Sequence, residues 1–212
     1  PDDHHLFASL GCAVENIVQA APSLGLAPSV ELSADLQNGT TVRLEATAIS
    51  PSPLAQMIHL RQCTRANFDA KPVPIDDLKA LEAVASGGKT NLTLLASPED
   101  IGRFAKLIAD ATVSQMRDSA FVAELTDWIR FSYGQALDTR DGLFSLCSGN
   151  PALPGPVGRV LLGFVATPAS ESQRYEIQVK ATSGIAIFSS AEDNPQHWFE
   201  AGRSYQRFAL EA

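Results

Sequence analysis

The sequence predicts an α+β fold, because segments with helical periodicity alternate along the chain with segments of strand-like periodicity. In residues 4–21, apolar side chains recur every three or four positions, which is the spacing of an amphipathic helix. In residues 30–32 and 42–45, apolar and polar side chains alternate instead, as in a half-buried strand. With 45% hydrophobic and 19% charged residues, the chain of 212 residues has the composition of a globular protein that buries a core.

The first fifty residues predict a helix followed by a hairpin. The helix of residues 4–21 should end near Pro22, because proline interrupts helical hydrogen bonding. The two alternating segments that follow flank Asn38-Gly39, a dipeptide typical of hairpin turns. Ser50-Pro51-Ser52-Pro53 then predicts a linker, since closely spaced prolines break both helices and strand ladders. We therefore expect a domain boundary after residue 50.

Beyond the linker, the same two periodicities continue to alternate. Helices are expected at residues 54–60, 75–86, 98–111, 121–129 and from Pro195 onward. Strands are expected at residues 91–95, 175–180 and 185–188, and an irregular loop at residues 149–158. The clearest helix start is Ser97-Pro98-Glu99-Asp100, which combines a capping hydroxyl, a proline at the first helical position and acids near the positive end of the helix dipole.

Two arginines stand four residues apart, within Leu60 to Asp69, in a chain of net charge -8. On a helix, residues four apart share one face, and each guanidinium can bind a phosphate or carboxylate with a planar set of donors. Arg61 and Arg65 are therefore candidate anion ligands at the end of a short helix. The alternative is that they pair with nearby acids such as Asp69 or Asp76, as exposed arginines commonly do.

The segment from Arg61 to Asp69, with Lys71-Pro72-Val73-Pro74, resembles the opening signature of the nitroreductase superfamily. In that family an Arg-x-Ser/Thr-x-Arg segment holds the phosphate of FMN, and a Phe-Asp and a Pro-Val-Pro lead into a helix. Cys63 departs from the pattern, because the family has Ser or Thr there. Further blocks resemble the double-length, Acg-like branch, in which two nitroreductase-like halves are fused. These blocks are residues 124–130, 141–143 and 198–207.

The resemblance implies a nitroreductase-like fold with two fused half-domains and pseudo-twofold symmetry. Residues 1–50 would be the C-terminal part of a first half, and residues 51–212 a second half whose C-terminal end is missing. The chain would then be an internal fragment, and it begins without Met. A faint internal repeat agrees with two halves, because residues 10–17 align with residues 201–208 so that Gly11 falls on Gly202. Each half would contribute a central helix with a small residue at a close contact.

The resemblance also implies an FMN-dependent oxidoreductase that passes hydride from NAD(P)H through the flavin to a nitro- or quinone-type acceptor. Arg61 and Arg65 would bind the phosphate, with Gln62 and Cys63 offering polar or backbone contacts. Asp141-Gly142 resembles an acidic-Gly pair near the flavin ring, and a surface turn is its alternative reading. A flavin-storage protein that binds FMN without turnover is a second functional hypothesis. A third hypothesis is a protein that keeps the fold, binds no cofactor and acts as a structural partner.

Composition argues against other partners and compartments. A net charge of -8 disfavours binding to nucleic acid or to an anionic membrane surface. No apolar run approaches the roughly 20 residues that span a bilayer. The three cysteines fit a cytoplasmic location, although export of the full-length protein stays open. We expect a small-molecule electron acceptor as partner, and a monomer that acts as a pseudo-dimer or a homo-oligomer.

No metal site is expected from the sequence. His4-His5 lacks a third ligand at suitable spacing, and the three cysteines, Cys12, Cys63 and Cys147, do not have the spacing of a zinc site. The pair formed by His59 and Cys63 lacks a third group that would orient it for nucleophilic catalysis, so we expect it to be structural. Catalytic residues stay unassigned.

Overall fold

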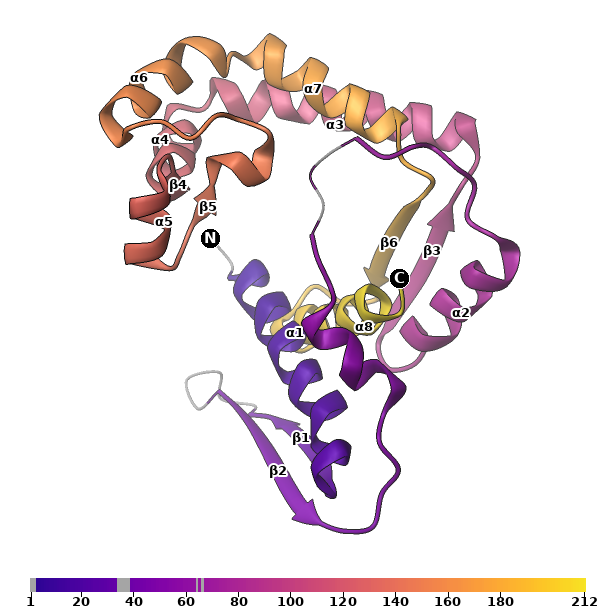
Figure 1. Cartoon of the computed structure of the whole chain (residues 1–212). Coiled ribbons are helices and arrows are strands. Elements are labelled where there is room, and N and C mark those ends of the chain that lie inside the picture. Colours follow the sequence, from indigo (N-terminus) through magenta and orange to yellow (C-terminus); the bar gives the residue numbers. More distant parts are fainter. Residues whose placement is uncertain (1–2, 34–38, 64, 66) are drawn as a thin grey trace. The chain divides into compact units, whose positions relative to one another are not determined.

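The computed structural model describes residues 3–33, 39–63, 65 and 67–212 (Figure 1). These residues form a mixed structure of helices and strands, which is the α+β class. Within the described ranges, no helix is both long and apolar enough to cross a bilayer. Contacts between residues divide the chain into two compact units.

Unit 1 comprises residues 1–62, 73–94 and 186–212. Its longest elements are α1 (His4–Ala20) and α8 (Pro195–Glu211), which pack against each other. Its other helices are η1 (Ala21–Leu24), η3 (Pro53–His59) and α2 (Ile75–Ala85), of which η1 and η3 are 3-10 helices. Its strands are β1 (Leu26–Leu32), β2 (Thr40–Ala46), β3 (Thr90–Leu95) and β6 (Ile185–Ser190), and the last residue of β3 and the first of β6 already belong to unit 2.

The hairpin predicted after the first helix is confirmed. β1 and β2 pair in antiparallel register with Val30 opposite Val42. The amide of Ser33 donates to the carbonyl of Gly39 at 3.1 Å, beside the turn. Gly39 has a φ of 68°, the left-handed conformation that the expected turn requires, while Asn38 lies outside the described residues. Residues 47–52 have no regular structure, as the linker prediction requires.

Two glycines set the distance between α1 and α8. A Cβ atom on Gly11 would lie 2.1 Å from the carbonyl oxygen of Phe199, and a Cβ atom on Gly202 would lie 1.9 Å from the carbonyl oxygen of Ala8. Only glycine leaves room for backbones this close. The Cys12 thiol donates to the carbonyl oxygen of Gly202 at 3.2 Å across the same contact.

A buried carboxylate lies beside this contact. The Glu15 side chain is 1% exposed, and its Oε2 accepts hydrogen bonds from Arg203 Nε at 2.9 Å and from Arg207 Nη1 at 3.2 Å. Its Oε1 accepts from Gln19 Nε2 at 2.6 Å. Arg207 Nε also donates to the carbonyl oxygen of Val84 at 2.9 Å, which ties α8 to α2. The acid of α1 is therefore held by two cations of α8, as a buried charge must be.

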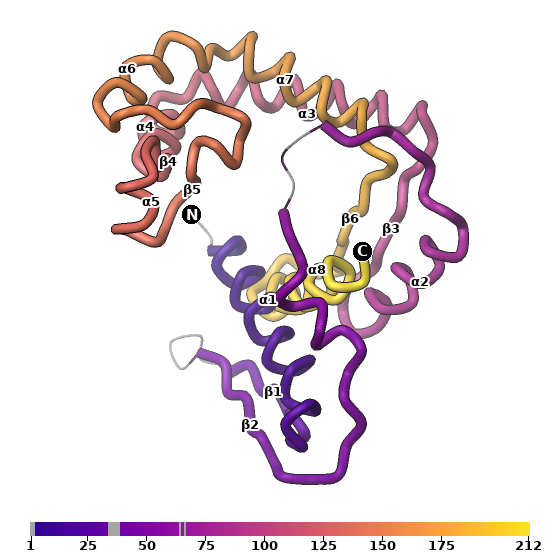
Figure 2. Tube along the Cα trace, viewed as in Figure 1, coloured from indigo at the N-terminus to yellow at the C-terminus, as the bar shows by residue number. Residues whose placement is uncertain are grey.

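Unit 2 comprises residues 63–72 and 95–185. The long helices α3 (Pro98–Arg117) and α7 (Pro168–Lys180) lie side by side (Figure 2). The remaining helices are α4 (Ser119–Trp128), α5 (Tyr133–Thr139), the 3-10 helix η4 (Ser145–Ser148) and α6 (Gly155–Val165). Two short strands, β4 (Ile129–Arg130) and β5 (Leu143–Phe144), pair in parallel. The predicted start of α3 is confirmed, because the Ser97 hydroxyl accepts from the Asp100 amide at 3.1 Å.

Two predictions for unit 2 are wrong. Residues 175–180 belong to α7 rather than to a strand. This helix begins with a capping box between Thr167 and Ser170, and Glu176 pairs with Lys180 one turn later at 2.6 Å. The predicted loop of residues 149–158 ends early, since α6 begins at Gly155. Pro156 is tolerated there because the first helical amides need no partner within the helix.

Candidate functional site

The arginine segment is not helical, so the prediction that Arg61 and Arg65 share a helical face is wrong. η3 ends at His59, and the amides of Leu60 and Arg61 both bond to the carbonyl of Met57. From Arg61 to Pro74, no described residue lies in a helix or strand, and Thr64 and Ala66 are outside the described residues. The segment also crosses between the units, because Arg61 and Gln62 belong to unit 1 while Cys63 and Arg65 belong to unit 2.

Within unit 1, the charge of Arg61 influences the thiol of Cys12 on α1. Burial raises the pKa of the Cys12 thiol, and the positive charge of Arg61 opposes this effect, as does a backbone hydrogen bond. The acids considered as alternative partners of the arginines have lysine partners. Asp69 pairs with Lys71 at 2.6 Å, and Asp76 pairs with Lys79 at 3.0 Å.

Arg65 is exposed and its backbone is fixed to α7. Its carbonyl oxygen accepts a hydrogen bond from Gln178 Nε2 at 2.9 Å. The guanidinium of Arg65 forms no ion pair with any residue that the structure describes. An unpaired arginine in an acidic chain, held in place by its backbone, is suited to bind an anion.

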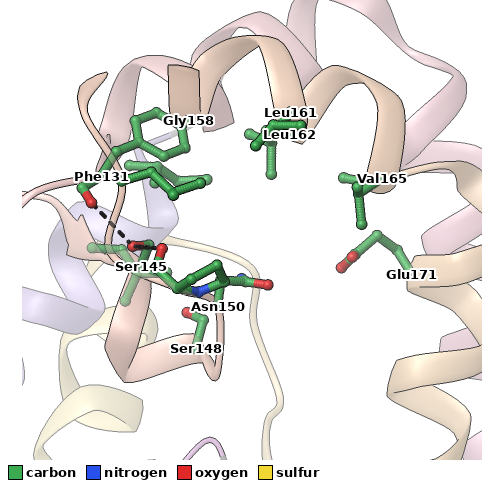
Figure 3. A pocket seen from close by; sticks show the side chains of 14 residues that line it. Phe131, Ser145, Ser148, Asn150, Gly158, Leu161, Leu162, Val165 and Glu171 are labelled. Atoms are coloured by element: carbon green, nitrogen blue, oxygen red, sulfur yellow. Dashed lines mark hydrogen bonds between the residues drawn. The ribbon is translucent and has the colours of Figure 1, made fainter. Parts of the chain in front are cut away.

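Arg65 also lines a cavity in unit 2. This larger cavity has a volume of about 370 Å³ and is bounded mainly by α3, α4 and α7. A smaller cavity of about 170 Å³ lies against Phe131, η4 and α6 (Figure 3). The two cavities adjoin, because both are lined by the same set of residues. This set is Ile129, Leu143, Ser148, Asn150, Leu162, Ala166 and Glu171.

The walls of the two cavities are mostly apolar, with several polar groups among them. Ser148, Asn150 and Glu171 lie where the cavities adjoin, and Figure 3 shows the side chains of Asn150 and Glu171 pointing into the same space from opposite sides. Arg174, which forms an ion pair with Glu171, lines the larger cavity with Arg65. An apolar cavity with a few convergent polar groups is the usual form of a small-molecule site.

Asp141 binds Arg130, and Gly142 lies at a bend directly after it. Asp141 Oδ1 accepts from Arg130 Nε and Nη2, both at 2.8 Å. Gly142 has a φ of 68°, and a Cβ atom there would lie 2.3 Å from the carbonyl oxygen of Trp128. Neither residue lines the two cavities described here. These contacts supply a structural reason for the pair, and its role beside a flavin stays a prediction.

Asp141→Asn is expected to lower the melting temperature at pH 7. Hydrogen bonds from the Thr139 hydroxyl and from Arg130 lower the pKa of Asp141 in the folded protein. The stabilisation is therefore present above the unfolded pKa of about 3.9 and is lost as the pH falls through the lower, folded value. The difference in melting temperature, measured by circular dichroism, should shrink below about pH 4. Asp138→Asn, at an exposed position of α5, is the matched control, and a difference independent of pH would contradict the ion-pair explanation.

The chain matches no protein-family model, and it has no significant match to a curated protein or to a solved structure. Among the described residues, no three His, Cys, Asp or Glu side chains gather so as to hold a metal ion. The nitroreductase resemblance therefore rests on the residues of the chain alone.

Sequence reasoning missed four polar residues of the cavities, which are Ser148, Asn150, Glu171 and Arg174. Ser148 and Asn150 lie in or beside the segment expected to be an irregular loop, where no periodicity marks a side chain as inward-facing. Glu171 and Arg174 are three residues apart, which on a helix brings them together. The spacing of Glu171 and Arg174 could have indicated this pair, but only if the segment had been predicted as a helix. A strand was predicted instead for the adjacent residues 175–180.

Proposed function

We propose that the chain is part of an FMN-binding NAD(P)H oxidoreductase of the nitroreductase superfamily. The observation that carries the proposal is the exposed guanidinium of Arg65, which has no ion pair among the described residues and stands in the segment that resembles the family's phosphate-binding signature. An exposed guanidinium without an ion pair can bind an anionic ligand through its planar set of donors. The phosphate group of FMN is such an anion.

The donor set fits a phosphate. Arg61 and Arg65 are separated by three residues, so their Cα atoms lie within about 14 Å of each other in any chain conformation. We propose that both guanidiniums bind one phosphate group, with Gln62 and Cys63 between them offering backbone amides. Cys63 cannot replace the hydroxyl that the family has at this position, so we assign phosphate binding to the two arginines. Bound FMN would supply the hydride-transfer chemistry, while these residues bind and orient it.

We further propose that the chain contains parts of two fused halves related by a pseudo-twofold axis. Support comes from the glycine contacts, because the residue contacted by Gly11 is Phe199 and the residue contacted by Gly202 is Ala8. Phe199 precedes Gly202 by three positions, just as Ala8 precedes Gly11. Exchanging the two helices therefore reproduces the contact, as the repeat in the sequence requires. A boundary after residue 50 and a nitroreductase-like fold belong to the same proposal.

The double variant Arg61→Ala, Arg65→Ala is expected to bind FMN at least tenfold more weakly than the parent chain. A hydrogen bond to a charged group contributes about 1.5–3 kcal/mol, so the loss of two such ligands has a large effect. Equilibrium dialysis with FMN measures the dissociation constant. The control is Arg103→Ala, Arg117→Ala, which removes two exposed arginines of α3 outside the segment. Equal affinity in the parent and in the double variant would rule out the assigned site.

A non-turnover flavin-storage protein is the second candidate function. It uses the same phosphate ligands, so FMN binding alone does not separate the two. Steady-state oxidation of NAD(P)H with a quinone or nitroaromatic acceptor does, because a storage protein would bind FMN without an acceptor-dependent rate. An acceptor-dependent rate that disappears in the double arginine variant would support the oxidoreductase.

A further inference from the structure

The larger cavity of unit 2 has a positively charged lining in a chain that is acidic overall. The charged residues that line it are Arg65, Glu171 and Arg174, so two cations accompany one anion and the lining has a net charge of +1. The chain as a whole has a net charge of -8. A hollow with low-dielectric walls and an excess of positive charge concentrates anions.

The excess charge belongs to Arg65, because the other two groups neutralise each other. Arg174 Nε donates to Glu171 Oε2 at 3.1 Å, and Arg174 Nη2 donates to the same oxygen. The guanidinium of Arg174 also lies 4.8 Å from the centre of the Tyr175 ring, a cation–π contact that holds it in place. Arg65 forms no ion pair with any residue that the structure describes. The cavity therefore suits a ligand with a single negative charge.

The remaining walls define the body of such a ligand. The Phe121 and Tyr175 rings line the larger cavity, together with aliphatic side chains such as those of Ile108, Leu125 and Leu162. Aromatic side chains pack favourably against an aromatic ligand in stacked or edge-on contact. The cavity, at about 370 Å³, is within the range of ordinary small-molecule sites. A ring system attached to one anionic group fits both the walls and the charge.

We propose that the larger cavity binds an aromatic monocarboxylate, with the carboxylate on the guanidinium of Arg65 and the ring among the apolar walls. The planar donors of a guanidinium match the two oxygens of a carboxylate. The site shares Arg65 with the proposed flavin site but does not rest on that proposal, because its test uses no flavin. A chain that binds the carboxylate and not FMN would refute the flavin proposal alone, and the reverse result would refute this one alone.

The probes are 2-naphthoate and 2-naphthamide, which share two rings and differ in charge. Equilibrium dialysis against the 212-residue chain at pH 7 is expected to show saturable binding of 2-naphthoate and about tenfold weaker binding of 2-naphthamide. Arg65→Ala should weaken 2-naphthoate binding about tenfold and leave 2-naphthamide binding unchanged, and Arg65→Lys should restore part of the loss. Arg103→Ala, at an exposed position of α3 outside the cavity, is the matched control.

A variant of the opposite sign tests the charge argument. Glu171→Gln removes the anion of the lining and leaves Arg174 unmatched, so 2-naphthoate should bind about threefold more tightly. The matched control is Glu176→Gln, which breaks another ion pair of α7, that with Lys180, outside the cavity. Unchanged or weaker binding in Glu171→Gln would overturn the assignment of the charge to the ligand.

A steric variant tests the location of the site. Ala166 lines the cavity, so Ala166→Phe should weaken the binding of both probes about tenfold. Ala169→Phe, at an exposed position near the start of α7, is the matched control. Unchanged binding in a folded Ala166→Phe variant would overturn the location, and equal affinity for the aliphatic decanoate would overturn the aromatic class. Absence of saturable 2-naphthoate binding, or equal affinity for 2-naphthamide, would overturn the proposal as a whole.

Discussion

Glu15→Ala is expected to lower the free energy of unfolding of unit 1 by about 3 kcal/mol, a cost typical of breaking a buried ion pair from one side. The Glu15 carboxylate is 1% exposed and bonded to two arginines, whose side chains are 20% and 17% exposed. Removing the acid leaves Arg203 and Arg207 largely out of water without their anion. Because the two cations are not fully buried, we expect a loss near the lower end of the range measured for such pairs.

Trp198 lies on α8, so its fluorescence during urea unfolding reports on this unit in a Trp128→Phe background. The matched control is Glu31→Ala, which breaks an ion pair with Arg43 between side chains that are more than 60% exposed. Exposed pairs of this kind contribute less than about 1 kcal/mol. Equal losses in the two variants would mean that burial does not govern the stabilisation by Glu15.

The helices of unit 1 could be predicted because their apolar periodicity and their end signals agree. α1 and α8 have both, and Asn194 caps α8 by accepting a hydrogen bond from the His197 amide at 3.1 Å. The polar cluster around Glu15 was not predicted, because its members are about 190 positions apart along the chain. No local pattern marks an acid on one helix as the partner of arginines on another.

In unit 2, the short-range pattern was misleading. Tyr175 to Lys180 alternates apolar and polar side chains as a strand does, yet the segment continues a helix that begins with a capping box at Thr167. Six residues are too few to separate the two periods, so the start signal decides. The prediction for the arginine segment erred in the opposite direction, because it assumed a helix where there is none. η3 ends at His59 and does not extend to Arg61.

The candidate site could be predicted only in part. Arg65 was found through its segment, whereas the paired charges of Glu171 and Arg174 are recognisable only once Pro168–Lys180 is seen to be a helix packed against α3. Which side chains line a cavity depends on the elements that the fold packs around it.

Gly202→Ala is expected to destabilise unit 1 by about 3 kcal/mol, the upper end of the usual cost of overpacking. The new Cβ would lie 1.9 Å from the carbonyl oxygen of Ala8, and the contact is to backbone, which cannot rotate away. Gly11→Ala should cost a similar amount, because its Cβ would lie 2.1 Å from the carbonyl oxygen of Phe199. Trp198 fluorescence during urea unfolding, in the Trp128→Phe background, measures both variants.

Gly102→Ala is the matched control, because Gly102 lies within α3 and a Cβ atom there would meet nothing within 4 Å. It should stabilise unit 2 by about 0.5–1 kcal/mol through helix propensity alone, which the fluorescence of Trp128 on α4 measures in a Trp198→Phe background. The double variant Gly11→Ala, Gly202→Ala carries the sharper information. Once one alanine has forced α1 and α8 apart, the second meets a wider gap. The double variant should therefore lose less stability than the sum of the losses in the two single variants. Full additivity would mean that the two glycines act at independent contacts, and it would remove the support that their reciprocal contact gives to two fused halves.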